Sequence, residues 1–182
     1  MVAKVIIGKT IRGVLSYNEN KVKEGTAACI KAEGFPMRAD GLSFKDKLQT
    51  FLDCHLQNRN VKTNALHISL NFDPSEKFDS NKLGEIAAAY LSKIGFGDQP
   101  YLVYQHFDAA HPHVHLVTTN VKLDGNRIDL HNIGRNASEE ARKEIEVEFK
   151  LVKAQRRKSA PAARSASRWP IAASLLAGYC PA

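Results

Sequence analysis

Two strand-like segments joined by a short turn constrain this chain more than any other feature. Residues 100–107 and 112–121 have the composition of strands, and the few residues between them are short enough for a β-hairpin. The hairpin sequence HFDAAHPHVHLV, which begins at His106, holds four of the chain's seven histidines. Because side chains alternate along a strand, His113 and His115 share one face, and closure of the hairpin brings His106 close to them.

Three imidazoles on neighbouring strands predict a metal site. Without an ion they would make a poor core and an unstable cluster of charge. Imidazole suits Zn²⁺, Mn²⁺, Ni²⁺, iron and copper, and three protein ligands leave open positions on the ion, as catalytic sites do. Asp108 and His111 lie in the turn. We expect Asp108 either to fix the tautomer of a metal-bound imidazole or to accept a proton.

The hydrophobic pattern of the remaining chain predicts an α+β fold. Ser43 and Asp46 have the spacing of a capping box before a helical period, and Gly95 is expected to follow the end of the clearest helix. The segment 9–34 is mixed, and its polar middle is expected to be a helix or an ordered loop. We expect strands at residues 1–8, 63–72, 100–107 and 112–121 and helices at residues 44–57, from 80 to about 94 and beyond 137. This order predicts an antiparallel sheet with helices packed on one face.

Length and composition indicate one soluble domain with a polyanionic partner. A chain of 182 residues can build one core but is short for two. Lys and Arg number 26 against 19 Asp and Glu, and the net charge of +7 favours a polyanionic partner. The three cysteines include no CxxC pair, which fits a reducing cytoplasm. No apolar run at the start of the chain is long enough for a signal sequence or a membrane segment.

An abrupt change of composition predicts a domain boundary near residue 158. Beyond a predicted exposed helix and the basic run 153–158, the sequence turns to Ala, Ser, Pro and Arg. We therefore assign the folded domain to residues 1–158 and expect residues 159–182 to be a disordered or non-native tail.

Three segments of the sequence resemble the motifs of relaxases, the mobilisation nucleases of the HUH endonuclease superfamily. The pattern H-x-D-x-x-H-P-H-x-H at 106–115 resembles the histidine motif, and LSYNENKV at 15–22 resembles the tyrosine motif. HISLNF at 67–72 resembles the middle motif. The resemblance runs over roughly residues 1–155 in the order of the family. It implies an HUH relaxase-like fold with a ferredoxin- or RRM-like core.

The resemblance also implies roles for individual residues. His106, His113 and His115 would bind a divalent ion, with Mg²⁺ or Mn²⁺ favoured over Zn²⁺ or Ni²⁺. Tyr17 would be the nucleophile, although the residues alone leave Tyr104 as a competitor. The middle motif, which includes His67, would support the DNA and the site. Basic residues close to Tyr17 in the sequence are expected to contact phosphates: Lys4, Lys9, Arg12, Lys21 and Lys23.

These roles together predict a site- and strand-specific DNA endonuclease and strand transferase. A phenol, with a pKa of ~10, needs a base or a local positive charge to attack at neutral pH. Tyr17 would attack single-stranded DNA at an origin of transfer, form a 5′-phosphotyrosine and free a 3′-hydroxyl. Such nicking serves conjugative mobilisation, in which accessory mobilisation proteins are expected partners.

Three other functions compete with the relaxase. A rolling-circle replication initiator or transposase normally carries its tyrosine after the histidines, and this chain has no tyrosine between His115 and Tyr179. A catalytically inactive remnant would bind DNA without a metal. A zinc hydrolase would cleave with a metal-bound hydroxide and form no covalent intermediate. Because relaxases usually continue past the nuclease domain, we expect a C-terminally truncated member.

Overall fold

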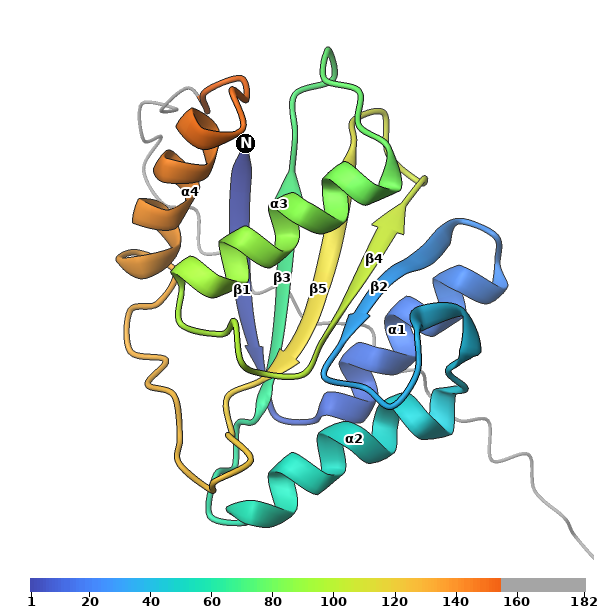
Figure 1. Ribbon diagram of the computed structural model, residues 1–182, viewed down its shortest axis with the longest axis vertical. Helices are drawn as coiled ribbons and strands as arrows, with labels where there is room; N and C mark the ends of the chain where they lie inside the picture. The colour runs from blue at the N-terminus through green and yellow to red at the C-terminus, as the bar shows by residue number, and fades with distance from the viewer. Residues whose placement is uncertain (155–182) are drawn as a thin grey trace, which may run out of the picture.

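A computed structural model describes residues 1–154 as one α+β unit (Figure 1). The predicted tail at 159–182, and all but the first two residues of the basic run 153–158, lie outside the described residues. The elements in chain order are β1 (Val2–Gly8), α1 (Ile11–Lys23), β2 (Ala27–Glu33), a 3₁₀ turn (Ala39–Gly41), α2 (Phe44–Gln57), β3 (Ala65–Asn71), α3 (Ser80–Lys93), β4 (Tyr101–His106), β5 (His113–Thr119) and α4 (Ala137–Glu148).

The strands form one five-stranded sheet in the order β1-β3-β5-β4-β2, and every neighbouring pair is antiparallel. β5 lies at the centre and pairs with β4 through the predicted hairpin. The segments β1–α1–β2 and β3–α3–β4 each connect parallel strands that are not neighbours, so each helix crosses the sheet. The α+β fold class and the antiparallel sheet are therefore confirmed.

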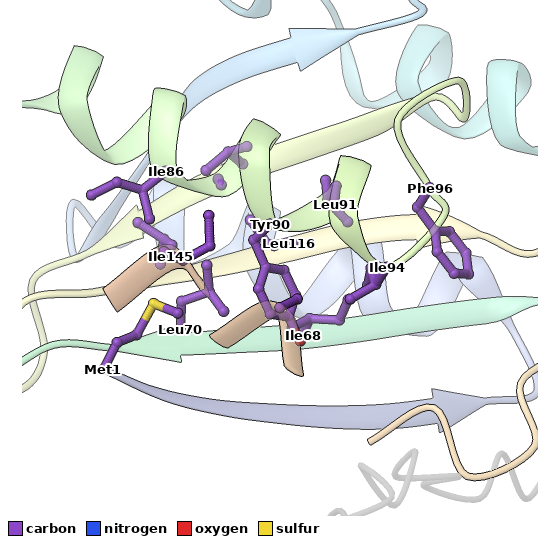
Figure 2. Close-up of a cluster of buried hydrophobic side chains, with 14 of the residues drawn as sticks. Met1, Ile68, Leu70, Ile86, Tyr90, Leu91, Ile94, Phe96, Leu116 and Ile145 are labelled. Atoms are coloured by element: carbon purple, nitrogen blue, oxygen red, sulfur yellow. The ribbon is translucent and has the colours of Figure 1, made fainter. Parts of the chain in front are cut away.

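The expectation that the helices pack on one face is wrong, because helices cover both faces. α3 and α4 pack on one face, over a core that includes Ile68, Leu70 and Leu116 (Figure 2). α1 and α2 pack on the other face, against Leu102 and Val117 among others. The physical reason is that the central strands are buried on both sides. Two separate apolar surfaces of the sheet then need cover.

The segment 9–34 holds a helix and a strand that its mixed sequence did not separate. Ile11, Leu15 and Asn18 form the buried side of α1. β2, of sequence AACIKAE, has few residues that favour strands, and it was not predicted. Its pairing with β4, interrupted by a register shift between Cys29 and Lys31, holds it in the sheet.

The other predicted element boundaries agree closely with the structure. Ser43 and Asp46 form the expected capping box, in which Ser43 Oγ accepts from the Asp46 backbone N–H at 3.3 Å and Asp46 Oδ2 accepts from the Ser43 N–H at 3.0 Å. Gly95 follows α3 with a φ of +84°, a conformation that glycine adopts without strain. Within residues 1–154, none of the helices has the length and apolar character that a membrane span requires.

Candidate active site and metal centre

The register of the β4–β5 hairpin brings three histidines together on the face of the sheet that α1 covers. His106 pairs directly with His113, and Tyr104 pairs with His115. One nitrogen from each of the three imidazoles lies within 4.8 Å of the others. The ring centroids of His106 and His115 are 4.0 Å apart, and each lies 5.5 Å from that of His113. The three predicted metal ligands therefore form a compact triangle.

Hydrogen bonds fix two of these imidazoles in one tautomer. The Asn18 amide donates to the Val14 carbonyl at 2.9 Å, which leaves Asn18 Oδ1 to accept from His106 Nε2–H at 2.9 Å. His113 donates through Nδ1–H to the backbone carbonyl of His111 at 3.2 Å. The lone pairs of His106 Nδ1 and His113 Nε2 are then available to an ion.

The donor set fits a divalent cation. Within the described residues, the buried Nδ1 atoms of His106 and His115 have no hydrogen-bond partner. Such an orphaned acceptor costs about 1–3 kcal/mol, which coordination to an ion would offset. Burial lowers the pKa of His106 to about 4, against the opposing charge of Asp108, and lowers that of His115 to about 2. Both rings are therefore neutral at pH 7, the form that binds metals.

Asp108 lies beside the nitrogens that face this site. Its Oδ1 is 3.4 Å from His113 Nε2 and 3.8 Å from His106 Nδ1, and its Oδ2 is 3.2 Å from Lys21 Nζ. Burial acts to raise the pKa of Asp108, but the Lys21 hydrogen bond and the charges of His106 and Lys21 together hold it below its usual value. Asp108 is therefore a carboxylate at neutral pH. Asp108 was expected either to fix the tautomer of an imidazole or to accept a proton. Asn18 and the His111 carbonyl fix the tautomers of His106 and His113, so the first role does not fall to Asp108.

Tyr17 is brought to the histidine cluster from the beginning of the chain. Its ring stacks on His106 at 6.3 Å and on His115 at 6.1 Å, with interplanar angles of 17° and 21°. The competing Tyr104 is fully buried and donates its hydroxyl to Glu19 Oε1 at 2.5 Å. Burial, with the charges of Cys29 and Glu19, raises the pKa of Tyr104. Of the two tyrosines, Tyr17 is the one whose ring stacks on the histidine cluster.

The ring of His67, on β3, contacts both Tyr17 and the histidine cluster. Its ring meets that of His115 edge-on at 4.7 Å and that of Tyr17 at 5.9 Å. Burial is the main cause that lowers its pKa to about 4, and the charges of His106 and Lys4 act in the same direction. His67 is therefore a neutral ring that lies against His115 and Tyr17.

The predicted basic residues divide into two groups. Lys21 is connected to the site by its ion pair with Asp108. Lys4 of β1 pairs with Ser69, which lies two residues from His67 on β3. Lys9 precedes α1, Arg12 lies in its first turn and Lys23 ends it, and all three are exposed. These three surround the helix that carries Tyr17 and do not form part of the cluster itself.

Two functional contacts of α1 were not predicted from the sequence. Asn18 orients His106, and Glu19 accepts from both Tyr104 and Lys47, the latter at 2.8 Å. A buried asparagine resembles any polar residue of a helix in the sequence. Its spacing from Ile11 and Leu15, which places all three on one side of α1, is the signal that could have shown it to be buried.

The fold and the site define an α+β domain that can hold a divalent ion beside a tyrosine, an arrangement suited to a phosphodiester. The family model of MobA/VirD2-like relaxase nuclease domains matches residues 17–151. The chain therefore belongs to this relaxase family, which gives it a DNA-nicking role and confirms the resemblance seen in its motifs. No curated protein and no solved structure gave a match.

Proposed function

We propose that this domain nicks one DNA strand at an origin of transfer by a tyrosine transesterification, as the relaxase of a conjugative mobilisation system. The observation that carries the proposal is the ring of Tyr17 stacked on two of the three histidines that could hold a metal. The site and strand specificity, the covalent intermediate and the role in transfer are all parts of this proposal.

The proposed step exchanges one phosphodiester for another. The Tyr17 oxygen forms a bond to phosphorus, the bond from phosphorus to the 3′ oxygen breaks, and the 3′ oxygen takes up a proton. A divalent ion bound by His106, His113 and His115, for which we propose Mg²⁺ or Mn²⁺, would polarise a non-bridging phosphate oxygen and offset the developing charge. Because the phosphate stays esterified to Tyr17, the freed 3′-hydroxyl can reverse the step without ATP.

Asp108 is the proposed acceptor of the proton from the Tyr17 hydroxyl, and the positive charge of Lys21 is proposed to assist its release. The ammonium of Lys21 is held charged, chiefly by its hydrogen bond to Asp108, and a charge on Tyr17 would raise its pKa further. The positive charge of Lys21, one helical turn from Tyr17, would offset negative charge that develops on the attacking oxygen. The Asp108 carboxylate, which Lys21 helps to keep ionised, is the proposed proton acceptor.

The proposed substrate is single-stranded DNA. Exposed Lys9, Arg12 and Lys23 would contact phosphates along α1, while His67 supports the site from β3. Accessory mobilisation proteins at the origin are proposed partners, and the cytoplasm, where the DNA lies, is the proposed location.

A covalent adduct tests the proposal. The protein is incubated with Mn²⁺ or Mg²⁺ and single-stranded oligonucleotides that tile the DNA on both sides of its own gene, and SDS-resistant adducts are sought by electrophoresis. We expect an adduct that Tyr17→Phe abolishes and that the matched control Tyr101→Phe retains. His113→Ala should lose both the metal and the adduct.

Other results would point to other functions. An adduct that persists in Tyr17→Phe would show that the nucleophile is misassigned. Cleavage without any adduct would indicate a metal-dependent hydrolase. Oligonucleotide binding that EDTA does not change, without cleavage, would indicate an inactive DNA-binding remnant.

A further inference from the structure

A cavity of about 440 Å³ opens beside the histidine cluster, near the start of β1. Its lining includes Val2, Asn71, Pro74, His111 and Lys153. We propose that this cavity receives the nucleotide on the 5′ side of the nick, the one that leaves with the 3′-hydroxyl. The inference rests on the proposed transesterification by Tyr17 and adds a nucleotide-binding subsite to it.

The cavity and Tyr17 lie toward opposite ends of the cluster. The ring of Tyr17 stacks on those of His106 and His115. His111, which lines the cavity, has its ring centroid 5.3 Å from that of His113. Asn71 pairs with His113 across β3 and β5, and Val2 pairs with Asn71 across β1 and β3. Successive contacts therefore lead from Tyr17 through the metal-binding triangle to the cavity.

The arrangement of Tyr17, the three histidines and the cavity in succession matches the geometry of phosphoryl transfer. The attacking and leaving oxygens lie roughly in line on opposite sides of the phosphorus. When a tyrosine attacks to form a 5′-phosphotyrosine, the leaving oxygen is the 3′ oxygen of the preceding nucleotide. With the phosphate at the triangle and Tyr17 on one side, that nucleotide departs toward His113 and the cavity.

The lining of the cavity suits a nucleobase. Asn71 is held in one orientation, because its Nδ2 donates to Ser69 Oγ at 3.2 Å and to the Val2 carbonyl at 3.4 Å. Its Oδ1 accepts from His111 Nε2–H at 3.2 Å, so Nδ1 of His111 remains an acceptor. Val2 and Pro74 supply apolar walls, and Lys153 supplies a positive charge for a phosphate further upstream.

His111 also connects this subsite to the metal centre. Its backbone carbonyl accepts from His113 Nδ1–H, and its ring bonds to Asn71. A base that contacts the His111 ring would therefore order the residue that orients a metal ligand. This gives a role to the one histidine of the hairpin that the metal triangle does not use.

Deoxynucleoside monophosphates test the subsite without knowledge of the origin sequence. The Mg²⁺-loaded full chain is titrated with the four 3′-monophosphates and with the four 5′-monophosphates, and binding is followed by NMR. A 3′-phosphate bound at the triangle directs its nucleoside to the cavity, whereas a 5′-phosphate directs it to the other side. We expect the 3′ series to shift the signals of Val2, His111 and Lys153 and to bind about tenfold more tightly.

Two tryptophan variants of β1 make the test specific. Val2→Trp fills the cavity from an exposed strand position, and we expect it to abolish the preference for the 3′ series while Mg²⁺ affinity is retained. Ile7→Trp adds the same bulk at an exposed position on the opposite face of β1, and it should retain the preference.

The inference is overturned if the 5′ series shifts the cavity signals as strongly, if the 3′ series shifts only His113 and His115, or if neither series binds. These outcomes are separate from failure of the proposed function. A Tyr17 adduct that forms in a protein whose cavity ignores 3′-monophosphates would refute the subsite alone. Cavity binding in a protein whose adduct survives Tyr17→Phe would refute the nucleophile alone.

Discussion

Asn18 joins the helix of the candidate nucleophile to the candidate metal centre. It is fully buried, follows Tyr17 directly in α1 and accepts from His106 Nε2–H. The same amide donates to the backbone of its own helix at Val14, so its orientation is fixed. One side chain therefore fixes both the tautomer of a candidate metal ligand and the position of the helical turn that carries Tyr17.

Replacing Asn18 by alanine should weaken metal binding. His106 would lose the acceptor that holds its Nδ1 toward the ion, and loss of such a partner typically lowers metal affinity by about 10–100-fold. Isothermal titration with Mn²⁺ measures the change. Asn20→Ala, at an exposed position of the same helix, is the matched control. Equal affinity in wild type and Asn18→Ala would show that the hydrogen bond does not support the site.

The neutral histidines should make the metal-free protein sensitive to acid. The pKa values of His67 and His106 are lowered to about 4 and that of His115 to about 2, in each case chiefly by burial. The unfolded chain, with histidine pKa values of ~6.5, binds more protons as the pH falls below that value. Stability is therefore lost as the pH falls from 6.5 to about 4 through His67 and His106, and to about 2 through His115. We expect a loss on the order of 1–2 kcal/mol for each of these histidines at pH 5.

Urea unfolding in EDTA at pH 7 and pH 5 measures this loss. His115→Asn removes one of the three rings and should reduce the difference between the two pH values. A free energy of unfolding that falls equally in wild type and variant would exclude His115 as a source of the acid sensitivity.

At the scale of elements, a buried polar cluster ties α1 to α2 and to the sheet. Glu19 Oε1 accepts from Lys47 Nζ of α2 at 2.8 Å and from the Tyr104 hydroxyl of β4. Lys47 is only 4% exposed, so its charge is compensated almost entirely within the protein. This cluster is a second fixed anchor of α1 beside Tyr17, two residues away from it.

Lys47→Met should destabilise the fold by about 3–5 kcal/mol, because it leaves the Glu19 carboxylate, whose side chain is only 12% exposed, without its ion partner. Unfolding in urea gives the change in free energy, and the rate of adduct formation reports whether Tyr17 has moved. The double variant Glu19→Gln with Lys47→Met removes both charges and should recover part of the lost stability. A double variant less stable than Lys47→Met would contradict this account.

Elements with a strong period could be predicted from the sequence, whereas elements that depend on distant partners could not. The capping box and apolar stripe of α2 are local, and its predicted bounds agree with the structure. β2 has no local signal, since its alanine, lysine and glutamate residues become a strand only through pairing with β4. The face that each helix covers is likewise decided by the crossover connections.

The same distinction holds for the candidate site. The two-residue period of β5 and the short hairpin turn were enough to predict that His106, His113 and His115 converge. The approach of Tyr17 could be expected only from the family motif, because some ninety residues separate it from His106. Asn18 and Lys47 could not be assigned roles, since a buried polar side chain is recognised by partners that lie far away in the sequence.

At the scale of the whole molecule, metal binding and folding should be coupled. The three candidate ligands come from the neighbouring strands β4 and β5. The sheet that contains these strands is covered by α1 and α2 on one face and by α3 and α4 on the other. An ion that binds only the folded chain adds stability that rises with the logarithm of its concentration above Kd. The metal centre therefore reports on the integrity of the entire domain.

Mn²⁺ at about one hundred times its Kd should stabilise the protein by about 2.7 kcal/mol, a rise in Tm of roughly 5–10 °C. Differential scanning calorimetry measures the shift, and EDTA should reverse it. His113→Ala should show no shift at the same Mn²⁺ concentration. An equal shift in that variant would place the stabilising ion elsewhere.

Because side chains alternate along β5, the candidate metal centre depends on the number of residues between its histidines as much as on their identity. His113 and His115 share the face of the sheet that α1 covers because a single residue, Val114, separates them and occupies the apolar side beneath α3. Loss of the Val114 codon would turn one imidazole into that apolar layer and dismantle two surfaces of the sheet at once. In-frame changes of length within this three-residue run are therefore more damaging than most substitutions, whereas the exposed turn residues 109–110 have room to vary.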